Sequence, residues 1–136
     1  LRGIRGVTFE AAGVIRIATG LARHKTDRQR QAVVWDGQGR HAVTRARLVE
    51  VFADQAALVE CWLETGRTHQ IRVHAYALGF PLLGDALYSS PETNIIARPA
   101  LHAYSLSFNH PASNERVKFT APYPDDFATA LKRLKL

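Results

Sequence analysis

Two alternating segments, residues 42–52 and 57–64, restrict the possible folds most strongly. Apolar and polar residues alternate along 42–52, and 57–64 is a second run rich in apolar residues. A period of two residues is typical of strands with one buried face. The four residues between the segments, 53–56, are enough to turn the chain. The sequence therefore predicts an antiparallel hairpin in the middle of the chain.

The pattern changes after the turn at residues 65–67. From Thr68 to about Leu78 the apolar residues recur with the period of a helix, so we expect a helix here. Thr68 is a suitable N-cap, and Gly79 is a suitable end. The predicted buried face carries Ile71, Ala75 and Leu78, with His74 beside them.

The remaining elements follow from shorter patterns. We expect a strand at 14–18, a polar loop at 23–30, a second hairpin from 101–109 and 116–120, and a final helix that opens at 124–126. Neighbouring strands pair antiparallel, and the helices are few and separate from them. The predicted class is α+β, with a mixed, mostly antiparallel sheet, and we expect residues 1–136 to form a single domain.

Charge points to a polyanionic partner. Lysine and arginine number 18 against 12 acidic residues, a formal net charge of +6, and 14 of the 18 bases are arginine. Guanidinium groups grip phosphate in two places and stack on bases, so nucleic acid is the first candidate, and a plain basic surface is the alternative. The predicted phosphate contacts lie in the polar loop: Arg23, Lys25, Arg28 and Arg30.

Other classes are disfavoured. No apolar run reaches the roughly 18 residues that a membrane span requires. Cys61 is the only cysteine, so a reducing cytoplasm is the expected location. His69 and His74 are five residues apart, about 140° around a helix, which does not suit one metal ion, and the sequence predicts no metal site.

Residues 64–74, ETGRTHQIRVH, carry the densest chemistry. Arg67 and the free N–H groups that begin the helix could bind an anion. Arg72 shares another helix face with His69 and Tyr76, so it could reach a carboxylate or phosphate across a cleft. The alternatives are a solvated loop arginine for Arg67 and a surface salt bridge for Arg72.

This run resembles the C-terminal half of the catalytic domain of RluA-type pseudouridine synthases. The resemblance continues, in the same order, through ALGFPLLGDALY (77–88), LHAYSLSFNHP (101–111) and FTAP (119–122). The family isomerises uridines in ribosomal or transfer RNA without a metal or organic cofactor. The resemblance therefore implies an RNA partner, no cofactor and a base that is flipped out of its stack before reaction.

The resemblance also implies roles for particular residues. Arg72 takes the place of the arginine that pairs with the family's catalytic aspartate, and it would keep that carboxylate ionised and oriented. Ile71 belongs to the same motif, and with Arg67 and His69 it is expected at the substrate. Leu101 is expected to add apolar packing near the base, with a simple core position as the alternative.

The chain departs from the family where the chemistry begins. It contains no His-Arg-Leu-Asp segment followed by Thr-Ser-Gly. Ile4-Arg5-Gly6 resembles the Val-x-Gly step of the family's second motif, but the tyrosine that precedes this step in the family is absent from the sequence. Phe80 stands where many relatives carry histidine. Asp85 is expected to bind backbone N–H groups rather than to replace the nucleophile, and Tyr88 is expected to pack.

These departures predict a C-terminal portion of a catalytic domain that is inactive alone and prone to self-association through exposed apolar surface. A non-catalytic, basic RNA-binding module is the alternative.

Overall fold

The computed structural model describes residues 3–53, 55–89 and 95–135. Its elements, in chain order, are β1 (Val7–Phe9), a 3-10 turn η1 (Ala11–Gly13), β2 (Val14–Arg23), β3 (Gln31–Val34), β4 (Arg40–Phe52), β5 (Ala56–Leu63), α1 (Gln70–Ala77), β6 (Ser105–Asn109), β7 (Arg116–Thr120) and α2 (Asp125–Leu134). The predicted α+β class is confirmed, and every strand pair in the described residues is antiparallel.

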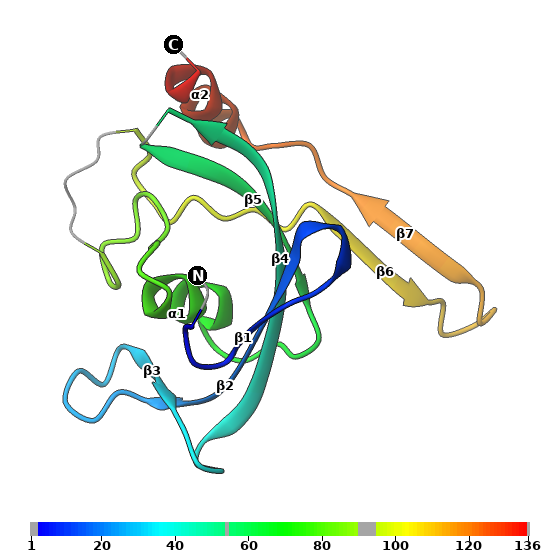
Figure 1. The fold of residues 1–136 in the computed structure, drawn as a ribbon. Helices are drawn as coiled ribbons and strands as arrows, with labels where there is room; N and C mark the ends of the chain where they lie inside the picture. The colour runs from blue at the N-terminus through cyan, green and yellow to red at the C-terminus, as the bar shows by residue number, and fades with distance from the viewer. Residues whose placement is uncertain (1–2, 54, 90–94, 136) are drawn as a thin grey trace.

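The main sheet is built around β2 and β4. β4 pairs with β2 on one side and with β5 on the other, while β1 and β3 pair with the two ends of β2. Figure 1 shows β4 as a long curved strand at the centre, with the β6–β7 hairpin extending away from the main body. Both predicted hairpins are confirmed, although Asp54 in the turn of the first lies outside the described residues.

The sequence patterns missed parts of this sheet. The predicted strand at 14–18 extends to Arg23, where β3 pairs with it, and β1 and β3 were not predicted at all. β1 is three residues long, and β3 has no alternation because each of its residues is half-buried. Residues 101–104 are outside β6, so the second hairpin is shorter than expected.

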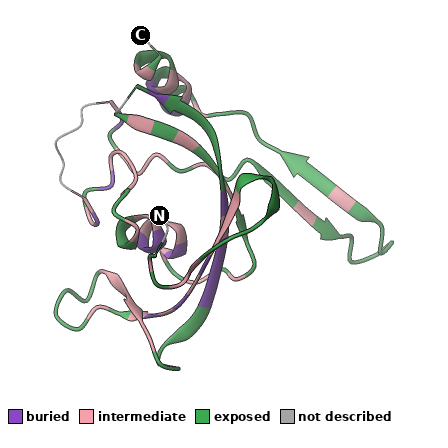
Figure 2. Ribbon diagram, viewed as in Figure 1, coloured by how far each residue is buried: buried purple, intermediate pink, exposed green. Residues whose placement is uncertain are grey.

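The core lies between the sheet and α1. Leu21 of β2, Ala42 of β4, Val73 of α1 and Tyr88 form one buried cluster, against which Val33 and Leu87 pack. In Figure 2 the buried residues follow the middle of β4 and one side of α1, whereas the β6–β7 hairpin is mostly exposed. The core therefore joins α1 to the strand pair β2–β4, and this contact positions the segment at residues 64–74.

Helix α1 packs on the sheet through a largely polar face, contrary to the prediction. Its buried residues are Gln70, Val73 and His74, while Ile71, Ala75 and Leu78 are only half-buried. Gln70 Nε2 donates to the Val43 carbonyl at 2.9 Å. The periodic apolar residues did not reveal this face because its side chains are satisfied by partners on the strands rather than by apolar contact.

The ends of α1 gave one wrong and one confirmed prediction. The N-cap is His69, with φ 55°, and not Thr68; the Gln70 side chain accepts a hydrogen bond from the Arg67 backbone N–H instead. At the other end, Gly79 has φ +87°. Its N–H donates to the Tyr76 carbonyl and the Phe80 N–H to the Ala75 carbonyl, as in a Schellman motif.

His74 makes the stability of the chain pH-dependent. Its side chain is 1% exposed, and its two ring nitrogens lie 2.9 Å from Thr19 Oγ1 and 2.8 Å from Thr44 Oγ1. Burial lowers the pKa of His74 from 6.5 to about 4. The unfolded chain therefore takes up a proton at a pH where the folded chain does not, so stability is fully present above pH 6.5 and is lost as the pH falls toward 4.

We expect the free energy of unfolding to drop by roughly 3 kcal/mol across this interval, measured by urea denaturation. His74→Gln should remove most of that drop, at a cost in stability at neutral pH. His110→Gln, a change at an exposed histidine, is the matched control and should keep it. A His74→Gln chain with the full acid-induced loss would contradict this assignment.

Neither helix in the described part of the chain has the length and apolar character that a membrane span requires.

Candidate functional site

Arg72 lies at a two-point ion pair with Asp85. Its Nε donates to Asp85 Oδ2 at 2.9 Å, and its Nη2 donates to Asp85 Oδ1 at 2.8 Å. The Arg72 side chain is 19% exposed and that of Asp85 is 0% exposed. Nη1 has no hydrogen-bond partner among the described residues. Asp85 therefore fixes the Nε–Nη2 edge of the guanidinium, and Nη1 can donate to a further acceptor.

Asp85 is held by the turn in which it sits. Oδ1 also accepts hydrogen bonds from the backbone N–H groups of Leu87 and Tyr88, as predicted. Gly84, with φ +74°, lets this turn approach the chain closely, because a Cβ there would lie 2.2 Å from the Arg98 carbonyl oxygen. Burial by itself raises the pKa of the Asp85 carboxyl, but the Arg72 guanidinium and the two N–H groups outweigh it and hold the pKa below its usual value.

Tyr88 connects this pair to the rest of the site. The Arg72 guanidinium carbon lies 5.2 Å from the centroid of the Tyr88 ring, and Tyr88 is 2% exposed, in agreement with the predicted packing role. The Tyr88 hydroxyl accepts the Gln31 N–H at 2.8 Å and lies 2.9 Å from His69 Nδ1. Burial and the nearby Arg72 charge lower the pKa of His69, so a neutral ring is favoured, and its Nδ1 can accept a hydrogen bond from the Tyr88 hydroxyl.

A second arginine lies against the same tyrosine. The Arg30 guanidinium carbon is 5.1 Å from the Tyr76 ring centroid and 5.2 Å from that of Tyr88. Arg30, Tyr76 and Tyr88 line an open cavity of about 450 Å³, together with Pro81, Leu87 and Ser89. Arg30 and residues of the 76–89 segment therefore surround one hollow, and Tyr88 of its lining also contacts Arg72.

The other predicted site residues have different surroundings. Arg67 Nε donates to the His41 carbonyl at 2.8 Å, so its guanidinium is used at least partly to attach the segment to β4. Ile71 is half-buried on α1. Leu101 is exposed, which disagrees with a simple core position. His69, the remaining predicted substrate residue, contacts Tyr88, with Nδ1 2.9 Å from the tyrosine hydroxyl.

The predicted basic loop divides into two parts. Arg23, Lys25 and Arg28 are exposed, and Arg28 Nη1 donates to the His24 carbonyl at 3.2 Å. Arg30, by contrast, is half-buried on the tyrosines. The charge pattern identified the loop, but only packing separates its last arginine from the others.

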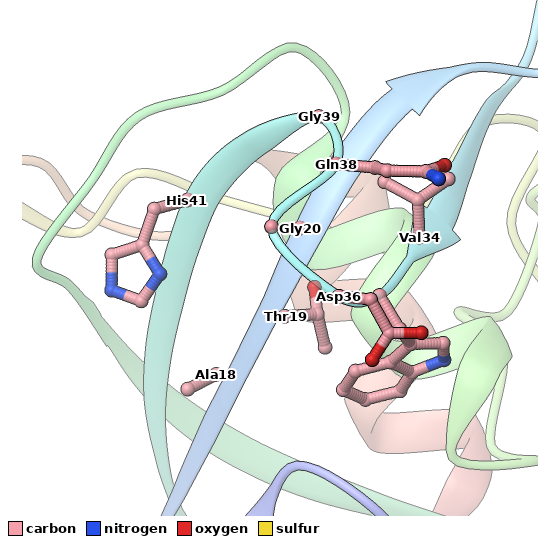
Figure 3. A pocket seen from close by; sticks show the side chains of 10 residues that line it. Ala18, Thr19, Gly20, Val34, Asp36, Gln38, Gly39 and His41 are labelled. Atoms are coloured by element: carbon pink, nitrogen blue, oxygen red, sulfur yellow. The ribbon is translucent and has the colours of Figure 1, made fainter.

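A second hollow, of about 280 Å³, lies between β2 and the turn from β3 to β4. His41 stands at one rim, opposite Val34, Asp36 and Gln38 (Figure 3). Its lining residues include no lysine or arginine. It includes none of the predicted site residues.

Comparison with known proteins gives the same family from sequence and from structure. The chain is 48% identical over 115 residues to an uncharacterized RNA pseudouridine synthase, YlyB, of Bacillus subtilis, which covers 85% of this chain and 37% of that protein. It is 42% identical over 124 residues to ribosomal large subunit pseudouridine synthase D of Zymomonas mobilis, covering 85% of this chain and 39% of that protein.

The fold is also similar to the solved structure of human RNA pseudouridylate synthase domain containing 1. The TM-score is 0.68 at 28% identity, over 87% of this chain and 52% of that one. The chain belongs to the RluA-type pseudouridine synthases. No family model matches it. The chain spans less than half the length of these two curated pseudouridine synthases.

Within this chain, the roles assigned to Arg72, Ile71, Leu101, Arg67 and His69 stay predictions. Sequence reasoning missed two contacts of the site. It did not pair Asp85 with Arg72, although an aspartate after a glycine turn was singled out, and it did not place Arg30 on Tyr88. Gln70 was also missed, because a buried glutamine carries no periodic signal.

Proposed function

We propose that the protein containing this chain converts uridine to pseudouridine in ribosomal or transfer RNA, without a metal or organic cofactor. The observation that carries the proposal is the Arg72 guanidinium, which Asp85 holds by two nitrogens while Nη1 remains without a partner among the described residues. Family membership and the ribosomal name of the Zymomonas relative support an RNA substrate.

In this proposal Arg72 serves a second carboxylate, the nucleophile. A carboxylate in a dry pocket would otherwise take up a proton, and an adjacent guanidinium favours its ionised form. Asp85 is not that nucleophile, because its side chain is buried and accepts hydrogen bonds from Arg72, Leu87 and Tyr88. The nucleophile is an aspartate outside this sequence, so the chain alone is inactive.

The remaining site residues take supporting roles in the proposal. Ile71, Leu101, Arg67 and His69 lie around the substrate, and Arg23, Lys25 and Arg28 contact RNA phosphates. Exposed guanidinium and ammonium groups suit phosphate contacts, which supply most of the salt-dependent affinity for RNA.

The test compares this chain with the full-length gene product. Both are incubated with ribosomal and transfer RNA that carries tritium at C5 of uridine, because C–C bond formation at that carbon releases the label. We expect release by the full-length product and none by the chain. Release by the chain would contradict the missing nucleophile, and no release by either would overturn the function. Salt-dependent RNA binding without release would support a non-catalytic module instead.

The organisation of the chain is proposed on the same basis. Residues 1–136 are taken as one domain, the C-terminal portion of a catalytic domain, in a cytoplasmic protein. Self-association of the isolated chain is proposed because β4 and β5 expose Leu48, Val51, Val59 and Leu63. Sedimentation velocity at two concentrations distinguishes association from a monomer.

A further inference from the structure

We propose that Arg30 holds an RNA phosphate next to the Arg72–Asp85 pair, so that the basic loop ends inside the site rather than on the outer surface. This inference rests on the proposed function and specifies how its substrate is held. Within the loop, Arg23, Lys25 and Arg28 are exposed, but Arg30 is half-buried against Tyr76 and Tyr88.

The position of Arg30 is fixed by its neighbours. The backbone N–H of the next residue, Gln31, donates to the Tyr88 hydroxyl, and β3 begins there. Arg30 and Arg72 both have their guanidinium carbons 5.2 Å from the Tyr88 ring centroid. The two cations are therefore separated by no more than twice that distance, on one shared aromatic support.

The local charge is not balanced. Arg72 is neutralised by Asp85, but no carboxylate lies within ion-pair distance of Arg30 in the part of the chain that the structure describes. Arg30 is also the only charged group among the described residues that line the adjacent cavity. A cation beside an open cavity, without an acidic partner, favours an anionic ligand.

No side-chain hydrogen bond of Arg30 is found among the described residues. Its Nε is covered by protein atoms, so a phosphate would be met by the terminal Nη groups. Packing on two tyrosines orients the guanidinium plane, and a planar fork can bond a phosphate in two places. The exposed basic side chains of the same loop are suited to contact the neighbouring phosphates of the RNA chain.

The test uses the full-length gene product and a short oligouridylate, with binding measured over a series of salt concentrations. Arg30→Gln should weaken binding and reduce the slope of log K against log salt by about one, the change expected for one lost phosphate contact. Arg30→Lys keeps the charge and should keep the slope. Lys132→Gln, the same loss of charge at an exposed position of α2, should leave the slope unchanged.

A purely structural Arg30 predicts a different result. In that case Arg30→Gln keeps the wild-type slope, or Arg30→Lys loses as much slope as Arg30→Gln, and either result overturns the proposal. Should Arg30→Gln fail to fold, Arg30→Met, which removes the charge but keeps an apolar side chain on the two tyrosines, takes its place and is read in the same way: a slope reduced by about one supports the phosphate contact, and a wild-type slope overturns it. Tritium release by the wild-type protein is measured in parallel. A slope change without release would preserve the phosphate site and reject the isomerase, whereas release with no slope change would do the reverse.

Discussion

Replacing Arg72 with alanine in the full-length gene product is expected to lower tritium release from C5-labelled uridine by about a hundredfold or more, the scale observed when one preorganised donor is removed from an active site. The reason is that the proposed nucleophilic carboxylate loses the cation that keeps it ionised and oriented. RNA affinity should stay within a few-fold of the wild type, because the exposed basic side chains at 23–28 and Arg30 remain. Filter binding and single-turnover release measure the two quantities separately.

This change also leaves Asp85 buried without its partner, so a loss of folding must be separated from a loss of chemistry. The control is the double variant Arg72→Ala with Asp85→Ala, in which no unpaired charge remains. It should be more stable than Arg72→Ala alone, yet equally slow in turnover. Arg72→Lys restores the charge but not the two-point geometry, and should recover little activity. Near-normal turnover in Arg72→Ala would remove its assigned role.

The second large effect is expected at Asp85. Asp85→Ala should lower the free energy of unfolding by about 3 kcal/mol or more, the usual cost of breaking a buried pair by removing one partner. The loss arises because Arg72 keeps a partly buried charge and the N–H groups of Leu87 and Tyr88 lose their acceptor. Urea denaturation of the chain at neutral pH measures the change.

The chain provides a matched control for Asp85. Asp126 makes the same two-point pair with Arg98, at 2.9 Å for both contacts, but both side chains are substantially exposed. Asp126→Ala should therefore lower the free energy of unfolding much less than Asp85→Ala, since solvent screens an exposed pair. Equal losses for the two variants would show that burial of the Asp85 pair contributes nothing. In the full-length product, Asp85→Ala should also lower turnover, because Arg72 is no longer positioned.

Predictions that depended on local patterns agreed well with the structure. The alternating segments around residues 53–56 form the β4–β5 hairpin, and Gly79 ends α1 with a positive φ because glycine adopts that conformation without a side-chain clash. The acidic start and basic end of α2 are also as expected. These features depend on the backbone period and on neighbours in the chain, which the sequence shows directly.

Predictions that depended on distant partners were less complete. The buried face of α1 was assigned to apolar residues, but Gln70 and His74 occupy it, because Val43, Thr19 and Thr44 on the strands satisfy them. The motif order pointed to Arg72 but not to the carboxylate that it meets 13 residues later in the chain.

The sequence by itself therefore determined the strand and helix periods, the excess of arginine and the family to which the chain belongs. Only the tertiary structure decided that Asp85 pairs with Arg72 through two hydrogen bonds, and that the Arg30 side chain packs on Tyr88. The physical reason is that a polar or charged side chain is stable in a buried position only when a matching partner is brought to it, and the folded arrangement of β2, β3 and α1 supplies those partners.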